Sequence, residues 1–247
     1  MDKKIRAAAI VGGVSLALVP AVAALGGGAG ATYTTTVSAG GTTTGSAGGA
    51  TTENGPGARN GATDRNRHSM AVGTAAALAL VDGDISDADA QALAAMVEEE
   101  KLAHDLYLTL GDQYDLGAFQ AIAVAESRHE ASVSALLDAY GLSDPTDGQA
   151  VGEFADPSLQ SLYDALLAQG LTSQEQALTV GGLVEETDIS DLRELATDEA
   201  SVNLVFDHLE SASENHLQAF VVSLDRLGVT YDAQVLTDAQ LAEIVGG

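Results

Sequence analysis

Six side chains of metal-binding type interrupt the apolar rows of four predicted helices in this 247-residue chain: Glu100, Glu126, His129, Glu185, Asp188 and His216. Residues three positions apart lie on one face of a helix, so Glu126 and His129 project a carboxylate and an imidazole in the same direction. Burying several unpaired carboxylates together costs free energy, and cations bound between them remove that cost. The set is rich in carboxylates and has no thiolate, which favours iron or manganese, with zinc as a third candidate.

Each of these residues also has an ordinary explanation when it is taken alone. In a chain with 36 acidic residues, some carboxylates fall on an apolar row by chance. Glu99 and Glu186 lie close enough in helical angle to replace Glu100 and Glu185. Two other histidines fall off the inner rows and are predicted to lie at the surface: His104 and His208. The argument for a shared site is that the candidates coincide near the middle of four different helices. Two close cations bridged by carboxylates would satisfy this number of acidic groups.

The elements that must position these groups are helices. From residue 72 onward, apolar residues recur at spacings of three and four, and strand-length alternation does not occur. Four long helices are predicted, over residues 87–113, 116–140, 173–196 and 199–227. Short helices are predicted from Pro157 to Gly170 and from Thr237 to Ile244, and the N-caps of three helices are predicted to be Ser86, Thr172 and Thr237. This pattern predicts an all-α fold, a four-helix bundle with an extra short helix between the second and third long helices and a short C-terminal helix.

The first 71 residues are predicted to lie outside this bundle. Residues 1–31 combine a basic start, an uncharged apolar run over residues 7–19 and small residues at A-x-A positions, which is typical of an export signal. The alternative is an uncleaved N-terminal anchor that holds the protein at a membrane. Residues 32–71 are rich in Gly, Thr and Ser and predict a disordered linker, which leaves residues 72–247 as the folded domain. We therefore expect a secreted or cell-surface protein.

Composition excludes several functional classes. The chain has no cysteine, so it forms no disulfide, no Cys-ligated zinc or iron–sulfur site and no thiol nucleophile. With 10 basic and 36 acidic residues, its formal charge of −26 repels phosphate backbones, and no nucleic-acid partner is expected. Concentrated salt relieves such self-repulsion by shortening the Debye length to about 3 Å near 1 M. We expect a salt-adapted source, a halophilic archaeon, and the alternative is an acidic cation-binding protein.

Around the six candidates the sequence resembles the ferritin-like superfamily of carboxylate-bridged di-metal bundles. The matching stretches are EEEKLAHDLY (98–107), ESRHEASVSALLDAYGLSDP (126–145), ALTVGGLVEETDISDL (177–192) and SENHLQAF (213–220). More narrowly, residues 75–246 are similar to domain-of-unknown-function family 2202, a ferritin-like group. Rubrerythrin-type bundles carry Glu-x-x-Ala-x-x-x-Tyr on the first helix, which Glu100, Ala103 and Tyr107 match, and this favours Glu100 over Glu99.

The resemblance implies a ligand set and a cofactor. The implied ligands are Glu100 and His129 for one metal, Glu185 and His216 for the other, Glu126 as the bridge and Asp188 in addition. The implied cofactor is a pair of iron ions, or iron with manganese, with zinc as a further option, and the implied partners are O₂ or peroxide. Tyr107 would donate a hydrogen bond to a ligand or pack in the core.

One departure from the rubrerythrin pattern matters. Ser213 stands where the fourth helix of those proteins carries the Glu of Glu-x-x-His. A serine cannot bridge metals, so the site would bind them asymmetrically, recruit Asp188 or Glu210, or hold one metal. Without cysteine the chain also lacks a built-in electron relay, and turnover would need an external reductant.

Two functions stay open from the sequence. The first is an exported di-iron oxidoreductase with oxidase, peroxidase or ferroxidase chemistry. The second is a non-enzymatic module displayed at the cell surface, which binds metal or serves as a helical scaffold. A ferritin-type storage cage is disfavoured because of the extra short helix and the exported tether, while smaller oligomers stay open.

Overall fold

The computed structural model describes residues 7–11, 14–18, 73–195 and 197–246. The predicted linker over residues 32–71 lies outside these ranges, as does most of the predicted leader. From residue 73 onward the described chain folds into helices and their connections. The prediction of an all-α domain is confirmed.

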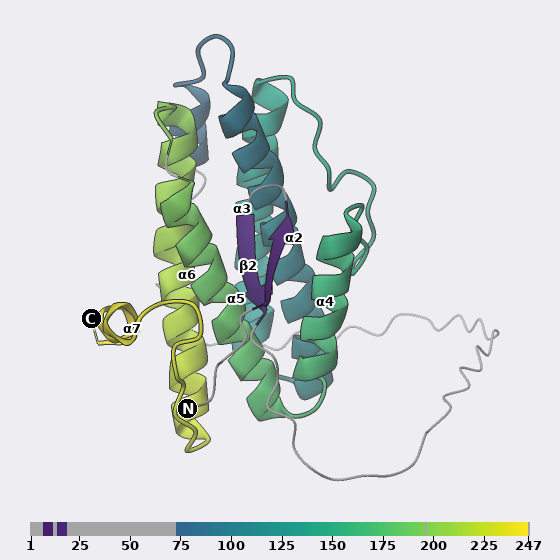
Figure 1. Cartoon of the computed structure of the whole chain (residues 1–247), viewed down its shortest axis with the longest axis vertical. Coiled ribbons are helices and arrows are strands. Elements are labelled where there is room, and N and C mark those ends of the chain that lie inside the picture. The colour runs from purple at the N-terminus through teal and green to yellow at the C-terminus, as the bar shows by residue number, and fades with distance from the viewer. Residues whose placement is uncertain (1–6, 12–13, 19–72, 196, 247) are drawn as a thin grey trace, which may run out of the picture.

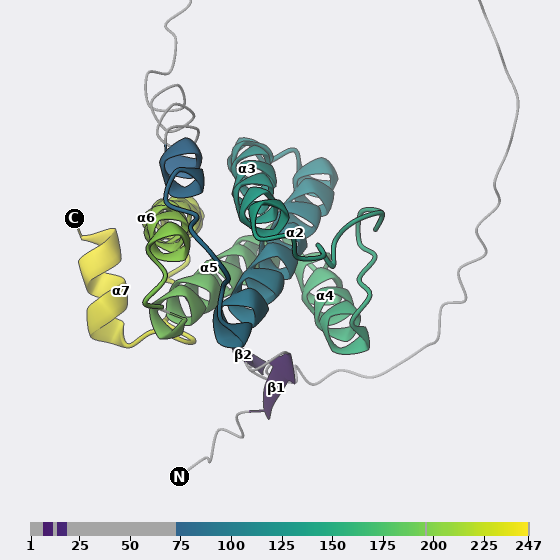
Figure 2. The same cartoon turned by 90° about the horizontal axis from the view of Figure 1, so that it is seen from above.

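Four long helices run side by side as a bundle: α2 (Asp87–Tyr114), α3 (Gly117–Ala139), α5 (Gln174–Glu194) and α6 (Ala200–Arg226) (Figure 1). α2 packs chiefly against α3, and α5 packs chiefly against α6. The two pairs meet through contacts of α3 with α6 and of α2 with α5. The short helix α4 (Pro157–Gly170) lies against α2 and α5, and α7 (Asp238–Val245) lies against α6 (Figure 2). The predicted bundle with its two short helices is therefore observed, with limits shifted by no more than two residues.

Side-chain oxygens cap the N-termini of all these helices except α3. Ser86 and Thr237, the predicted N-caps of α2 and α7, each accept a hydrogen bond from a backbone N–H in the first turn. The predicted cap of α5, Thr172, is wrong. Ser173 caps α5 instead, because Thr172 closes the end of α4, where its hydroxyl donates to the carbonyl of Gln169 at 2.7 Å.

Two apolar clusters fill the bundle, one toward each end. In the first, the rings of Tyr107, Phe119 and Phe220 pack with centroids 5.0 to 5.6 Å apart. The second cluster includes these buried side chains: Leu93, Met96, Leu136, Phe206 and Leu209. Along each long helix the inward row passes from one cluster to the other, and the predicted metal-binding residues lie between the two. The apolar ends supply the packing energy of the bundle, since burial of apolar surface is the main favourable term in folding.

Two short strands occupy the part of the leader that the structure describes. β1 (Ala7–Val11) pairs antiparallel with β2 (Val14–Leu18). β1 contacts α4 and β2 contacts α5, so the pair lies over the side of the bundle where those two helices meet (Figure 1). The same residues carry the apolar run for which the sequence predicts an export signal or an anchor, and that interpretation stays a prediction. Within the described ranges, no helix has both the length and the apolar character of a membrane span.

A buried carboxylate on α5 holds the C-terminal segment against the bundle. One oxygen of Glu186 accepts hydrogen bonds from three consecutive backbone N–H groups, those of Gln234, Val235 and Leu236, at 2.9, 2.6 and 2.8 Å. The side chain of Glu186 is fully buried. Backbone N–H groups away from water need hydrogen-bond partners, and this one carboxylate supplies the acceptor for three of them in the turn that leads into α7.

Replacement of Glu186 by alanine should therefore destabilise the domain. We expect Glu186→Ala to lower the free energy of unfolding by about 3 kcal/mol, because three N–H groups, one buried and two half-buried, lose their shared acceptor. The matched control is Glu175→Ala in the exposed first turn of the same helix, where a change below about 0.5 kcal/mol is expected. Chemical denaturation in concentrated salt measures both variants, and equal stability of the two would contradict this role.

Candidate metal centre

Four helices bring five metal-binding side chains to one place between the apolar clusters. α2 contributes Glu100, α3 contributes Glu126 and His129, α5 contributes Glu185, and α6 contributes His216. All five are buried, with at most 7% of their surface exposed. Isolated charged groups are rarely buried to this extent, so the five must compensate one another or bind something between them.

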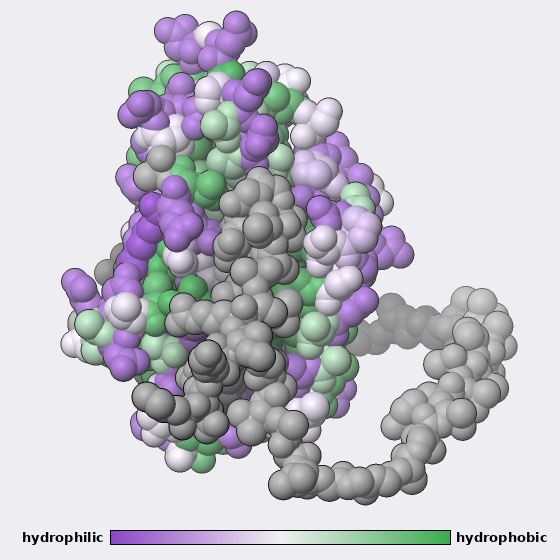
Figure 3. Space-filling model, viewed as in Figure 1, coloured by the Kyte–Doolittle hydropathy of each residue, from purple (hydrophilic) through white to green (hydrophobic). Residues whose placement is uncertain are grey.

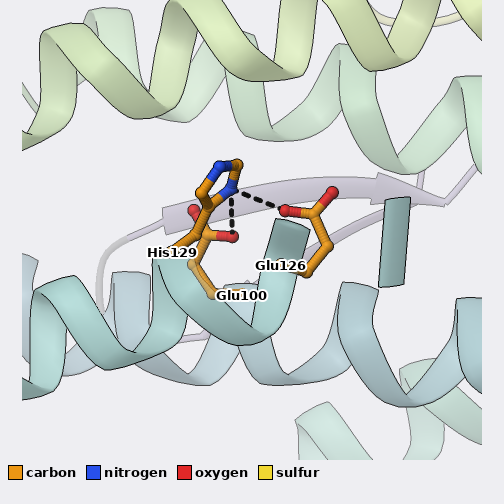
Figure 4. A group of neighbouring side chains, drawn as sticks. All are labelled: Glu100, Glu126 and His129. Atoms are coloured by element: carbon orange, nitrogen blue, oxygen red, sulfur yellow. Dashed lines mark ion pairs between the residues drawn. The ribbon is translucent and has the colours of Figure 1, made fainter. Parts of the chain in front are cut away.

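The five side chains form two triads that share Glu126. In the first triad, His129 Nδ1 lies 2.6 Å from Glu126 Oε2 and 3.3 Å from Glu100 Oε2 (Figure 4). In the second, His216 Nδ1 lies 2.8 Å from Glu126 Oε1 and 3.6 Å from Glu185 Oε2. The chosen ligand atoms of each triad lie within 4.8 Å of one another. Glu126 thus presents one oxygen to each triad, which is how a carboxylate bridges two cations.

The polar atoms of the triads are incompletely satisfied within the protein. Four of them are buried and have no hydrogen-bond partner: Glu100 Oε1, Glu126 Oε1, His129 Nδ1 and His216 Nδ1. The short nitrogen–oxygen approaches therefore lack the alignment of a hydrogen bond. Buried polar atoms without partners are rare in native structures and call for an unseen water or ion. Carboxylate and imidazole donors together suit iron, manganese or zinc, so the residues present fit a pair of such cations.

Tyr107 orients one of these carboxylates. Its hydroxyl donates to Glu185 Oε1 at 2.7 Å and lies 3.3 Å from the carbonyl oxygen of Gly181. The tyrosine ring packs at the same time against Phe119 and Phe220 in the adjacent apolar cluster. Tyr107 therefore serves both roles named from the sequence, hydrogen-bond donor and core residue. Gly181 permits this packing, because a Cβ there would lie 2.7 Å from the ring of Phe220.

Asp188, the sixth candidate, belongs to neither triad. It lies three residues after Glu185, and the hydroxyl of Ser213 donates to its Oδ2 at 2.5 Å. Ser213 thus stands beside the centre as a partner for Asp188, at the position where a glutamate was expected. Glu210, the other substitute considered, turns to the surface and pairs with Arg193 at 2.6 Å. Neither residue enters a triad to replace the missing glutamate.

The rival residues have other partners. Glu186 holds the C-terminal segment, so Glu185 is the residue of that pair that enters the centre. Glu99 joins neither triad, and Glu100 is the member of that pair that approaches His129.

The two histidines predicted to lie at the surface are also placed outside the centre. His104 lies 2.9 Å from Asp105 Oδ1, and His208 lies 2.7 Å from the carbonyl of Leu204. Both side chains are half-buried rather than fully exposed.

The Tyr107–Glu185 contact is one of two options that the sequence left open. The Ser213–Asp188 pair is a contact that sequence reasoning missed, although both residues had been placed on inward rows.

Burial and charge set opposite pKa shifts in the centre. Burial raises the pKa of Glu100 to about 7, and it raises the pKa of Glu185 to about 7 with help from the charge of Glu126. Burial alone would also raise the pKa of Glu126, but two imidazolium neighbours outweigh it and hold that pKa well below its usual value. Burial opposes the charged form of His216, yet Glu126 and Glu185 raise its pKa to about 10. In the metal-free protein these groups retain protons near neutral pH that a cation must displace.

Metal binding should therefore release protons in a pH-dependent number. Glu100 and Glu185, with pKa values of about 7, are largely protonated at about pH 6 and largely ionised at about pH 8. We expect Mn²⁺ to displace up to about two more protons at the lower pH, and its apparent affinity to rise with pH. Titration calorimetry in two buffers of different ionisation enthalpy counts these protons. The variant Glu175→Gln should behave as the wild type, and a count that does not change with pH would contradict the assignment.

Comparison with known proteins confirms the narrower of the two resemblances, to domain-of-unknown-function family 2202. Residues 89–247 match the family described as "Uncharacterized protein domain (DUF2202)". The "Uncharacterized protein MJ0754" of Methanocaldococcus jannaschii is 37% identical over 163 residues, which cover 65% of this chain and 88% of that protein. The crystal structure of hypothetical protein MJ0754 from Methanococcus jannaschii DSM 2661 matches with a TM-score of 0.66 at 36% sequence identity, over 68% of this chain and 97% of that chain. The chain therefore belongs to the DUF2202 family.

Proposed function

We propose that this chain is a di-metal protein of the ferritin-like type, which holds two iron ions, or iron and manganese, at the centre of its bundle. The observation that carries the proposal is the position of Glu126, whose two oxygens face two different Glu/His groups inside four helices. A single cation would satisfy one triad and leave the other with buried polar atoms that have no hydrogen-bond partner. Two cations satisfy both.

The ligand assignment follows the two triads. Glu100 and His129 would hold one metal, Glu185 and His216 would hold the other, and Glu126 would bridge them. We leave Asp188 out of this set, since its carboxylate is engaged by Ser213. When bound, an iron pair of this kind supplies electrons for the reduction of O₂ or peroxide.

The chain's own residues support such chemistry in two ways. The apolar clusters surround the centre with apolar side chains toward both ends of the bundle. Tyr107 fixes the orientation of Glu185 through its hydroxyl. Since the chain has no cysteine, its electrons come from an external reductant.

A second function is favoured by one observation. Each metal position has three protein ligands at most, because Ser213 replaces the glutamate expected on α6. A centre with fewer carboxylates could bind metal at the cell surface without redox turnover. Iron binding without oxygen consumption is the result that would select this second function.

Export and salt adaptation are parts of the same proposal. The basic start, the apolar run and the small residues of residues 1–31 support secretion or display at the cell surface. The formal charge of −26 supports a salt-rich environment, because exposed acids repel one another less when salt screens them.

The shared position of Glu126 predicts how iron binding responds to mutation. Wild-type protein loaded with Fe²⁺ and desalted in concentrated KCl should retain about two iron ions per chain, as paired-metal sites do. Glu126→Ala should weaken both positions, whereas His129→Ala should weaken chiefly one. The matched control is Glu210→Ala on the exposed side of α6.

Elemental analysis and an oxygen electrode provide the two readouts. Wild-type protein that retains no transition metal would refute the di-metal proposal. Loss of metal in Glu126→Ala together with oxygen uptake that stays at the wild-type level would refute the proposed redox function.

Salt should stabilise the domain strongly. Raising KCl from about 0.1 to about 1 M shortens the Debye length from about 10 to about 3 Å, which weakens repulsion among the exposed acids. We expect the midpoint of thermal unfolding to rise by more than about 10 °C over this range. Circular dichroism at about 222 nm, which reports helix content, follows the transition. A midpoint that is constant or falls with salt would contradict the proposed adaptation.

A further inference from the structure

An apolar cavity opens beside the metal ligands. Its walls come from α2, α4 and α5, and the main apolar contributors are Leu102, Leu159, Leu162, Leu166, Leu183 and Val184. Five residues with carboxyl groups line the same cavity: Glu99, Glu100, Glu126, Glu185 and Asp188. Counted together with the open solvent at its mouth, the space here amounts to about 600 Å³.

The short helix α4 lies to one side of the four-helix bundle. It supplies three of the leucines that wall the cavity. Leu159, Leu162 and Leu166 recur at spacings of three and four, so they share one face of α4. That face points toward α2 and α5, which both contact α4. The four long helices already enclose the metal ligands, so what α4 adds at this place is an apolar wall.

The walls restrict the chemistry of an occupant. Thr187 is a wall residue with a hydroxyl, but that hydroxyl donates its hydrogen to the carbonyl of Leu183 at 2.9 Å and cannot donate it to a ligand as well. The remaining polar groups are carboxylates, and the chain carries a formal charge of −26. An anionic head group is therefore disfavoured, whereas an uncharged aliphatic chain buries its surface without leaving a polar group unpaired.

The two described strands lie beside the helices that wall the cavity. β1 and β2 consist of Ala, Ile, Val and Leu with one Ser, and they contact α4 and α5, two of the helices that wall the cavity. In the space-filling view, hydrophobic residues show among hydrophilic ones on the coloured part of this face (Figure 3).

We propose that this cavity binds the uncharged aliphatic chain of a substrate and lays it against the side of the metal centre formed by Glu100, Glu126 and Glu185. The proposal deepens the proposed function, on which it rests for the reaction at the metals. Binding of the chain itself needs only the leucine walls, so it can be measured without metal.

The binding test uses a fluorescent probe and a competitor of stated chemistry. Metal-free full-length protein is mixed with Nile red in concentrated KCl, and 1-decanol is added to displace the dye. We expect saturable displacement by 1-decanol, and decanoate should displace the dye less well.

Variants locate the binding to the cavity. Leu162→Phe fills the space between α4 and α5 and should weaken 1-decanol binding at least about tenfold. Leu108→Phe, on the exposed side of α2, is the matched control and should bind as the wild type. Ala103→Leu narrows the cavity from α2 and gives a second, independent test if Leu162→Phe does not fold. No displacement by 1-decanol, or equal binding by the folded cavity variants and the control, would overturn the proposal.

A final measurement separates this proposal from the di-metal function. In Mn²⁺-loaded protein, bound 1-decanol should show faster proton relaxation than in the metal-free protein, and Glu126→Ala should abolish the difference. Metal retention without any relaxation effect would overturn the placement of the chain beside the metals. If 1-decanol displaces Nile red but the protein retains no metal after loading, the di-metal function is overturned and the apolar binding site remains supported.

Discussion

The sharing of one buried carboxylate between two imidazoles is the constraint on which the centre of this bundle depends. Glu126 lies between His129 on its own helix and His216 on α6, at 2.6 and 2.8 Å. Removal of either charge type would leave the other buried without compensation, at a cost of several kcal/mol. The register of α3 against α6 is therefore tied to this carboxylate as well as to the apolar packing on both sides of it.

The arrangement also explains the division of the core. A continuous apolar core would be simpler to fold, but the bundle has two clusters with ionisable groups between them. Tyr107 joins the two environments, because its ring packs in the aromatic cluster while its hydroxyl reaches Glu185. The Ser213–Asp188 pair has a similar place at the edge of the centre, where it satisfies an inward carboxylate that joins neither triad.

The short helix α4 gives the centre a second neighbour of different character. On the side of α4, the carboxylates border a wall of leucines instead of a helix with its own polar ligands. The metal centre that we propose, beside this cavity, would suit a small molecule with little polarity. This combination distinguishes the bundle from a symmetrical scaffold in which four equivalent helices close on the ligands from every side.

The sequence by itself determined the helices, the inward rows and the residue types of the centre. The spacing of apolar residues by three and four and the capping side chains are local features, so helix limits could be predicted to within two residues. Glu126 and His129 share a face by helical geometry alone. Only the tertiary structure decided which neighbours the ambiguous residues meet. Glu186 turns to the C-terminal segment, Asp188 meets Ser213, and the leucines of α4 border the ligands. The sequence could not decide these contacts because each one joins segments far apart in the chain. Helical angle also cannot rank residues that differ by one position.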